Sequence, residues 1–512
     1  MELFFFSHEP LFIFIISLIF LYLFHFHFST KHKNTHGFKI YPLLGALPEF
    51  ILNRHRFLDW TTQILRNCPT NTAVFTRPGK IHGIITANPD NIQHILKTKF
   101  ENYPKGERFI SLLQDFLGNG IFNSDGDLWK LQRKTASYEF NTKSLRNFVV
   151  ENVTVETQTR LIPILSKATE NNQILDLQDL LERFAFDNVC KLAFNVDPGC
   201  LSDDITTGDT STTAAETFMH AFEDAAMISS GRFMCLLPLL WKTKKYLNVG
   251  TERRLKQSIS TVHEFADEII RSRMEAKEAG EDLLSRFIGT EEASPEFLRD
   301  IIISFILAGR DTTSSALSWF FWILSSNRDI KDKIIEEIEM VRLKSGDKMA
   351  SFGYEELKEM HYLHAAISET MRLYPPVPVD TKACLNDDVL PDGTRIKKDW
   401  FISYHTYAMG RMESVWGKDC NEFKPERWLE NDKDGVSVCR SESPYRFPVF
   451  HAGPRMCLGK EMAYIQMKSI AASVMERFEI VALDKDTCPE HVLSLTLRMK
   501  NGLPVNVKRV VR

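Results

Sequence analysis

Hydrophobic residues recur at helical spacing over most of the chain, and the longest such pattern covers residues 294–326. Ser294 can cap the start of this helix, and Pro295 takes the first helical position, where proline is well tolerated. The segment is apolar on nearly all sides, which is typical of a helix buried inside a fold. Arg310 and Asp311 at its centre make a membrane span too costly. The pattern therefore predicts one long central helix.

Strand-like patterns are short and few. They occur near Ala73 (AVFTR), near His82 (HGIITA) and near Thr394 (TRIKKDWFISY). Two polar stretches, residues 202–213 and 430–443, are typical of surface loops. No internal repeat is present. We therefore expect a mainly α fold with minor β, built as one large helical domain.

The N-terminus differs from the rest of the chain. Residues 11–28 are almost wholly apolar and are long enough to cross a bilayer as a helix. A cleaved signal peptide is the alternative, but Glu2 and Glu9 precede the run and no small-residue cleavage site follows it. Lysines at positions 31, 33 and 39 come after the run. The positive-inside rule therefore predicts a single-pass anchor with a lumenal N-terminus and the remaining chain in the cytosol.

The domain organisation follows from this anchor. Residues 1–30 form the membrane anchor. Residues 31–50 contain glycine and proline at intervals too short for a continuous helix, which indicates a stiff Pro/Gly linker, although an ordinary loop explains them equally well. Residues 51–512 form the large domain.

The composition narrows the classes of binding partner to expect. The chain has 512 residues, 44% of them hydrophobic, and its formal net charge is -4. Such near-neutrality gives no sign of a nucleic-acid binder and favours small molecules and proteins as partners. Nine cysteines are scattered without a regular spacing, which argues against a disulfide framework and against a zinc site.

One cysteine lies in a distinctive loop, FHAGPRMCLG, at residues 450–459. Gly453 and Gly459 permit a tight turn and close approach to a flat group, and a helical pattern follows. The amides and dipole of that helix start favour a thiolate at Cys457, which can bind a metal. Arg455 can reach an anion, and Phe450 can shield the sulfur from water. Taken alone, Cys457 is better explained as a small buried hydrophobe.

A second motif, AGRDTT, interrupts the apolar central helix at residues 308–313. The small residues Ala308 and Gly309 leave room for a bulky ligand against the backbone. Asp311 and Thr312 place an acid and a hydroxyl where polar groups cost free energy unless they are paired or useful. They indicate a site that passes protons to a bound species. A helix kink satisfied by local hydrogen bonds is the alternative.

Two further motifs supply ionic side chains. Glu369 and Arg372 in ETMR lie three residues apart on one helical face, and FKPERW contributes Arg427. Such a pair is usually just solvated. If the three residues meet inside the fold, they form a buried charge network.

Together these motifs resemble those of the cytochrome P450 monooxygenases. FHAGPRMCLG matches the haem-binding signature FxxGxRxCxG, AGRDTT matches the oxygen-activation motif, and ETMR with FKPERW matches the ExxR and PERW pair, all in the family's order. The likeness covers essentially the whole chain, including the anchor. It implies the cytochrome P450 fold around a haem b, and it makes Cys457 a ligand despite its ordinary appearance alone.

The resemblance also implies roles for the haem-site residues. Cys457 is the axial thiolate on the haem iron, the metal ligand that favours O–O cleavage. Arg455 contacts a haem propionate, as do Trp129 and Arg133 of WKLQR, which is similar to the family's WxxxR. Lys382 stands where the family often has arginine, so its propionate contact is less firmly implied. The remaining cofactor-binding residues are Phe450, Gly453 and Gly459.

On the other side of the haem, the resemblance makes Asp311 and Thr312 the catalytic pair that delivers protons during oxygen activation. Glu369, Arg372 and Arg427 are similar to the family's structural triad. The hinge after the anchor reads YPLLGALP in place of the usual PPGP.

A narrower likeness points to a substrate class. Residues 102–106, 120–140 and 282–287 resemble the plant clan of fatty-acid omega-hydroxylases, in the branch that also holds jasmonoyl-isoleucine and steroid side-chain hydroxylases. The implied reaction is R–H + O2 + NADPH + H+ giving R–OH + H2O + NADP+. A fatty acid is the default substrate. Jasmonoyl-isoleucine, or a cholesterol-derived side chain in steroidal saponin biosynthesis, is the close alternative.

Chain-end selectivity requires a narrow apolar route above the iron, because a terminal C–H bond is stronger than its internal neighbours and positioning must prevail over reactivity. Core packing explains each candidate lining residue equally well. The candidates are Phe109, Leu117, Phe122, Phe305, Ala308, Val377 and Val379.

Electrons must come from outside, because the chain has neither a GxGxxG loop nor a flavin-like segment. The resemblance implies an NADPH-cytochrome P450 reductase at the endoplasmic reticulum membrane. Lys130, Lys134 and Lys460 flank the haem motifs and are candidates for its docking face, although a solvated surface explains them nearly as well. A reductase-independent haem-thiolate isomerase and a non-catalytic haem sensor are the alternatives. The intact Asp311 and Thr312 count against the isomerase.

Overall fold

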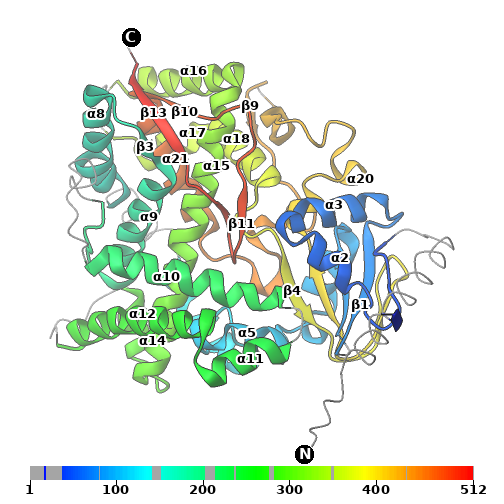
Figure 1. The fold of residues 1–512 in the computed structure, drawn as a ribbon. Coiled ribbons are helices and arrows are strands. Elements are labelled where there is room, and N and C mark those ends of the chain that lie inside the picture. The colour runs from blue at the N-terminus through cyan, green and yellow to red at the C-terminus, as the bar shows by residue number, and fades with distance from the viewer. Residues whose placement is uncertain are drawn as a thin grey trace, which may run out of the picture.

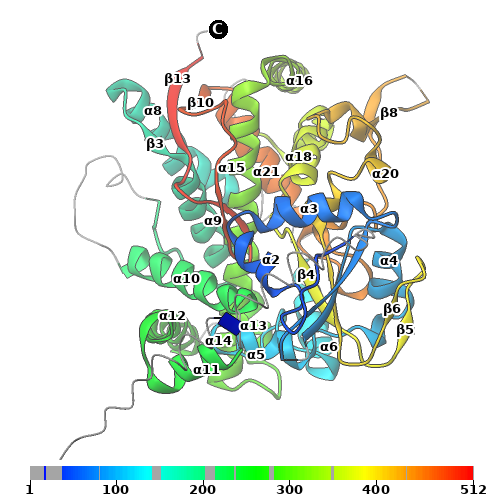
Figure 2. The same cartoon turned by 45° about the vertical axis from the view of Figure 1, so that its right-hand side comes forward.

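A computed structural model describes the chain in residues 17–18, 37–79, 81–140, 152–201, 214–235, 238–275, 282–346, 351–433 and 435–510. Figure 1 shows a larger part built from long helices and a smaller part built around the strands β1 and β4, with α2 and α3 beside them. After a 45° turn, α15 still runs through the middle of the helical part (Figure 2).

The helices differ in how much of their surface they bury, and α9, α15 and α21 are buried on nearly all sides. In chain order, the helices are α2 (Leu47–Leu52), α3 (Phe57–Asn67), α4 (Pro89–Gln93), α5 (Gly106–Leu117), α6 (Gly126–Ser137), α8 (Ile162–Asn171), α9 (Leu177–Phe194), α10 (Ala214–Gly231), α11 (Pro238–Leu247), α12 (Gly250–Glu275), α13 (Leu283–Ile288), α14 (Pro295–Ile306), α15 (Thr312–Ser326), α16 (Arg328–Ser345), α17 (Tyr354–Glu359), α18 (His361–Leu373), α19 (Thr406–Met409), α20 (Glu413–Trp416) and α21 (Lys460–Met475).

The strands are short, as the sequence predicts. They are β1 (Thr72–Arg77), β2 (Ile81–Thr86), β3 (Leu175–Asp176), β4 (Asp380–Ala383), β5 (Asp388–Val389), β6 (Arg395–Ile396), β7 (Phe401–Tyr404), β8 (Leu429–Asn431), β9 (Ser437–Cys439), β10 (Phe478–Ala482), β11 (His491–Leu493), β12 (Leu497–Met499) and β13 (Pro504–Arg509). The mainly α fold with minor β is therefore confirmed, and the three predicted strand regions correspond to β1, β2 and the pair β6 and β7.

The largest sheet has the strand order β1-β2-β7-β4. Strand β2 runs parallel to β7, with Gly83 opposite Phe401, and β7 pairs antiparallel with β4, with Phe401 opposite Ala383. A Cβ at Gly83 would come within 2.6 Å of the rings of Phe75 and Phe401, so only glycine fits between them. The sheet therefore brings the early hairpin β1-β2 next to the late strands.

The predicted central helix is confirmed. The Ser294 hydroxyl accepts a hydrogen bond from the Phe297 amide at 3.2 Å, which is the expected N-cap contact. Helices α14 and α15 continue the axis up to Ser326. Between them lies a π-helical turn, η7 (Leu307–Asp311), which the sequence pattern did not reveal. Such wide turns occur frequently at functional sites.

The core has separate apolar regions. Side chains of α9, α15, α18 and α21 form one of them, and side chains of α5, α10, α12 and α14 form another. A third lies under the sheet and includes Phe38, Ala46 and Phe50. Residues of the predicted linker therefore pack against the β1-β2 hairpin.

Two sequence predictions concern residues that the structure does not describe. The anchor at 11–28 lies outside the described residues except for Ser17 and Leu18, and the polar stretch 202–213 also lies outside them. Within the ranges given above, no helix is both long and apolar enough to span a bilayer. The predicted loop at 430–443 differs from expectation, because β8 and β9 pair there as a short hairpin.

Candidate active site

Cys457 lies in a loop whose shape is fixed by its own backbone. Its amide donates to the Phe450 carbonyl at 2.8 Å, and the Met456 amide donates to the Gly453 carbonyl at 3.0 Å. Gly453 has a φ of 64°, and a Cβ there would meet the Leu96 carbonyl at 2.0 Å. The close approach that Gly453 permits is therefore to the backbone of a neighbouring turn.

Cys457 is exposed, but its surroundings oppose ionisation of the thiol. Burial raises the pKa of the Cys457 thiol, while the Gly459 amide, Arg133 and Lys460 act in the opposite direction. The helix start at α21 thus does not by itself hold a thiolate, contrary to the expectation from the sequence. The residue nevertheless keeps accessible surface. A sulfur that a partner can reach in a shielded setting suits a metal ligand, because a coordinated metal deprotonates the thiol outright.

Helix α6 brings one aromatic side chain, Trp129, and one cationic side chain, Arg133, to this loop. The Arg133 guanidinium donates to the Met456 carbonyl, and the Trp129 ring lies 4.3 Å from the Arg455 guanidinium carbon. Arg455 in turn binds Asp125 at 2.7 Å. The buried Nε of Arg455 has no hydrogen-bond partner among the described residues. Trp129, Arg133 and Arg455 thus meet beside Cys457, as the sequence motifs predict.

A second group of charges surrounds Asp380 on β4. Its carboxylate lies 2.8 Å from the Lys105 ammonium and 3.1 Å from the Lys382 ammonium. It also accepts a hydrogen bond from the Tyr404 hydroxyl at 3.0 Å. Burial alone would raise the pKa of Asp380, but Lys105 and Lys382 outweigh it and hold the pKa well below its usual range. Nothing in the sequence motifs singled out Asp380 or Lys105.

Lys382 has too little negative charge around it. It is almost fully buried, and burial lowers its pKa well below the usual range even though Asp380 attracts the proton. His451 near Asp380 does not add an anion, and burial together with Lys382 lowers the His451 pKa to about 4. A further carboxylate would stabilise the ammonium form of Lys382.

The charges of the two groups do not balance. Arg133, Arg455, Lys105 and Lys382 bring four cations, whereas Asp125 and Asp380 bring two carboxylates. Together with the unpartnered Nε of Arg455, this surplus fits a ligand that carries two carboxylates, as haem does. An accessible cysteine and surplus cations beside it thus fit a haem, whose two carboxylates Arg133, Arg455 and Lys382 would hold.

The π-turn on the central helix holds the predicted acid and hydroxyl. Thr312 donates its hydroxyl hydrogen to the Ala308 carbonyl at 2.6 Å. A Cβ at Gly309 would come within 2.5 Å of Val189 on α9, so the smallness of Gly309 serves helix packing and not the ligand contact expected from the sequence. Burial raises the pKa of Asp311 to about 6, against the opposing effect of Arg310.

Behind Asp311 lies an ionic network that the sequence did not reveal. Arg310 lies 3.1 Å from Asp311 and 3.3 Å from Glu182 on α9. Arg498 on β12 binds Glu182 at 2.7 Å and also pairs with Glu223 on α10. These residues line a polar cavity of about 20 Å³, which has room for about one water molecule. The side chains come from four separate elements, so no spacing in the sequence points to them.

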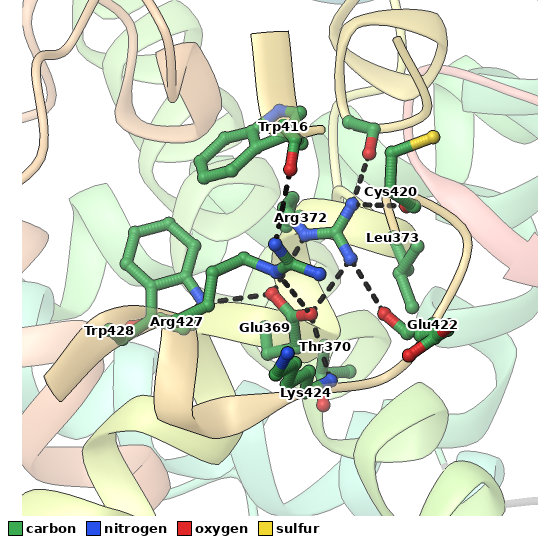
Figure 3. A network of polar contacts seen from close by, with 12 residues as sticks. Glu369, Thr370, Arg372, Leu373, Trp416, Cys420, Glu422, Lys424, Arg427 and Trp428 are labelled. Atoms are coloured by element: carbon green, nitrogen blue, oxygen red, sulfur yellow. Dashed lines mark hydrogen bonds and ion pairs between the residues drawn. The ribbon is translucent and has the colours of Figure 1, made fainter. Parts of the chain in front are cut away.

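Glu369, Arg372 and Arg427 meet in the interior, as Figure 3 shows. Both oxygens of the fully buried Glu369 carboxylate accept hydrogen bonds of 2.7 Å from Arg372. Arg427 donates to the same carboxylate at 3.1 Å, and the Trp428 indole donates at 2.8 Å. The three residues form a buried network, and the solvated-pair alternative is wrong.

This network ties α18 to the chain that leads to the cysteine loop. Arg372 donates to the carbonyls of Cys420 at 2.7 Å and Glu422 at 2.9 Å, and the Lys424 amide donates to Glu369 at 2.9 Å (Figure 3). Asp419 pairs with Arg427 at 3.1 Å. The two arginines are thus satisfied by carboxylates and by backbone carbonyls, which a buried charge requires.

The candidate lining residues divide into three sets by burial. Leu117 and Phe305 pack in the core of α5, α10, α12 and α14. Phe122 and Val377 keep 38% and 36% of their surface accessible. Phe122 precedes Ser124, whose carbonyl binds Arg455, and Val377 precedes Asp380 by three residues. The others, Phe109, Ala308 and Val379, are half-buried.

The comparison with known proteins agrees with this site. The family model described as Cytochrome P450 matches residues 36–505. The chain belongs to the cytochrome P450 family. Cytochrome P450 CYP94D108 of Paris polyphylla is 55% identical over 465 residues, which cover 91% of this chain and 90% of the relative. Cytochrome P450 94A1 of Vicia sativa is 48% identical over 482 residues, which cover 92% of this chain and 90% of the relative.

A third relative, Cytochrome P450 94B3 of Arabidopsis thaliana, is 46% identical over 504 residues, which cover 97% of this chain and 96% of the relative. The protein is therefore a monooxygenase of the cytochrome P450 94 group. P450 enzymes hold haem through a cysteine thiolate, and the bound haem activates O2 with electrons from a reductase. In this chain the cysteine of the matching signature is Cys457.

Proposed function

We propose that this P450 hydroxylates the terminal or near-terminal carbon of an aliphatic chain, with a fatty acid as the first substrate to test. The proposal rests on the near full-length similarity to the 94 group together with the accessible apolar side chains of Phe122 and Val377 beside the haem-site cations. Such side chains favour a lipid-like substrate, because they gain free energy when an alkyl chain covers them.

The residues of the chain divide the work of the reaction. Arg133, Arg455 and Lys382 would hold the two carboxylates of the haem, and Cys457 would hold its iron. Asp311 can take up and release a proton near neutral pH, because its pKa is raised to about 6. Thr312 lies next to it on the same turn. An apolar route to the site would let position and not bond strength select the carbon at the chain end.

The electrons would come from an NADPH-cytochrome P450 reductase. Lys130 and Lys134 are exposed on α6, four residues apart, and Arg133 of the same helix binds the cysteine loop. A helix that touches the haem loop and presents lysines to solvent suits the docking of an acidic electron donor. Lys460 at the start of α21 is half-buried and is a weaker candidate.

A location at the endoplasmic reticulum membrane is part of the proposal. Its main support is the apolar sequence at 11–28. The helix α11 also exposes several apolar side chains among its lysines, which is typical of a surface that contacts a bilayer. These exposed residues are Leu239, Leu240, Tyr246 and Leu247.

Product analysis tests the proposal. Microsomes that contain the full-length protein and a reductase are supplied with NADPH and with a fatty acid, jasmonoyl-isoleucine or a cholesterol-derived sterol. A chain-end alcohol that requires NADPH is the expected product. If none of the three classes gives one, the proposal is wrong. Conversion of a lipid hydroperoxide without NADPH indicates the isomerase instead.

A further inference from the structure

Two arginines near the sheet have no carboxylate partner among the described residues. Arg77 ends β1 and is 6% exposed, and its buried Nε has no hydrogen-bond partner within the described part of the chain. Arg108 lies half-buried on α5. In the described ranges, neither guanidinium pairs with a carboxylate. Burial and the nearby Arg108 lower the pKa of Arg77 to about 10.

Aromatic rings surround the two guanidinium groups. Arg77 lies 5.0 Å from the Phe50 ring and 6.0 Å from the Phe75 ring, and Arg108 lies 5.0 Å from the Phe401 ring. Phe75 and Phe401 are themselves 5.7 Å apart. The arginines therefore flank one aromatic pair and share one apolar surrounding.

The position of Arg108 is fixed by the packing of α5 on the sheet. Lys105, just before the helix, pairs with Asp380, and a Cβ at Gly106 would lie 2.3 Å from the Ala383 side chain. Ala383 is opposite Phe401 across the strand pair, which places Arg108 over that ring. The same contacts connect the arginine pair to the haem-site charges around Asp380.

Two like charges in an apolar surrounding without a carboxylate cost free energy. Such a pair suits a ligand that carries a negative charge on an apolar stem, because rings surround the guanidinium groups. A carboxylate accepts hydrogen bonds from two arginines with good geometry. A neutral sterol side chain offers no such group.

We propose that Arg77 and Arg108 bind the carboxylate of an acidic lipid substrate. This inference rests on the proposed chain-end hydroxylation and specifies its substrate class as a carboxylic acid. Arg77 ends β1, at the opposite edge of the sheet from β4, and Arg108 lies over Phe401 on β7, the strand next to β4. Binding the acid group between these two arginines leaves the opposite end of the chain for oxidation.

Equilibrium binding to the full-length holoprotein tests the assignment. Optical titrations compare dodecanoic acid with its methyl ester, which has the same chain without the charge. The unaltered protein should bind the acid more tightly than the ester. Arg108→Met should weaken acid binding about tenfold or more and leave ester binding unchanged, because a charge-assisted contact is lost. The same change at an exposed arginine, Arg328→Met, should alter neither affinity.

Other outcomes overturn the proposal. Equal weakening of acid and ester binding makes Arg108 a packing residue, and unchanged binding of both removes it from the substrate site. If Arg108→Met instead lowers flotation with phosphatidylserine vesicles while acid affinity stays the same, the arginines bind lipid headgroups. NADPH-dependent chain-end hydroxylation of the methyl ester is measured separately, so the proposed function can stand even if the anion site fails.

The stability of the Arg77→Met variant gives a second, independent readout. A structural arginine loses packing and ion pairs on substitution, so its variant melts at a lower temperature. A ligand-binding arginine that is buried without a partner should give a variant that melts at the same or a higher temperature and yet binds dodecanoic acid more weakly. A lower melting temperature together with unchanged acid affinity contradicts the proposal.

Discussion

The Arg310 guanidinium lies 3.1 Å from the carboxylate of Asp311, the residue that follows it in the chain, and the same guanidinium reaches Glu182 at 3.3 Å. One buried arginine thus forms ion pairs with two carboxylates. Its attraction is too weak to keep Asp311 fully ionised, because burial raises the pKa of Asp311 to about 6. The acid of the central helix is therefore half-protonated at a mildly acidic pH.

Replacing Asp311 should make the protein more stable and less active as a monooxygenase. The folded protein keeps a proton on Asp311 that the unfolded chain releases from about pH 4, so the ionised carboxylate costs stability as the pH rises to about 6. Asp311→Asn should therefore raise the melting temperature at pH 7 and leave it nearly unchanged at pH 4. Thermal unfolding of both proteins at both pH values checks this. Buried Asp187 and Asp300 also titrate in this range, so only the difference between variant and parent is informative.

The hydroxyl of Thr312 should affect how tightly NADPH consumption is coupled to product formation, and it should not affect haem binding. Thr312→Ala removes a hydroxyl whose described contact is the Ala308 carbonyl, so the helix should persist with little loss of stability. We expect unchanged haem content, normal NADPH consumption and more peroxide released per product. Thr312→Ser, which restores the hydroxyl, is the matched control. Equal coupling in the alanine variant and the parent would contradict a role in proton delivery.

Glu369 should be the most costly residue of the buried network to replace. Glu369→Gln leaves Arg372 buried without a carboxylate and Arg427 with Asp419 alone, and breaking such a network costs about 3–5 kcal/mol. We expect a large fall in the melting temperature and in the haem bound per chain. Glu430→Gln on exposed β8 is the control and should change neither quantity.

Cys457→Ser should abolish the carbon-monoxide difference band at about 450 nm that a thiolate-bound haem gives. The loop geometry depends on backbone hydrogen bonds from Cys457 and Met456, which serine preserves. The variant should therefore fold with a melting temperature close to that of its apo parent. Retention of the band would mean that another residue binds the iron.

The sequence predicted those features that neighbouring residues determine. The Ser294 cap, the apolar face of the central helix and the grouping of Trp129 with Arg133 on one helix follow from spacings of three or four residues. The signature around Cys457 is equally local. These are the features that the structure reproduces.

Contacts between distant segments that no recognised motif covers were not predictable. Asp380 meets Lys105 only because α5 packs on β4, and Arg310 meets Arg498 through Glu182 only because β12 lies beside α9. A kink at residues 308–313 was an alternative from the sequence, but its π-helical form at η7 was not predictable, because helical spacing continues on both sides of it. The expected ligand contact at Gly309 was wrong for a similar reason. Gly309 contacts Val189 on another helix, which a single sequence does not place next to it.

The pairing of Gly83 with Phe401 has a consequence for biosynthesis. A ribosome releases the β1-β2 hairpin long before β7, so the apolar edge around Ile84 and Ile85 has no neighbouring strand while most of the chain is still being made. An unprotected strand edge invites association with other nascent chains. Faster translation between residues 86 and 404, or added chaperone, should therefore increase the soluble yield of this protein more than changes made near its C-terminus.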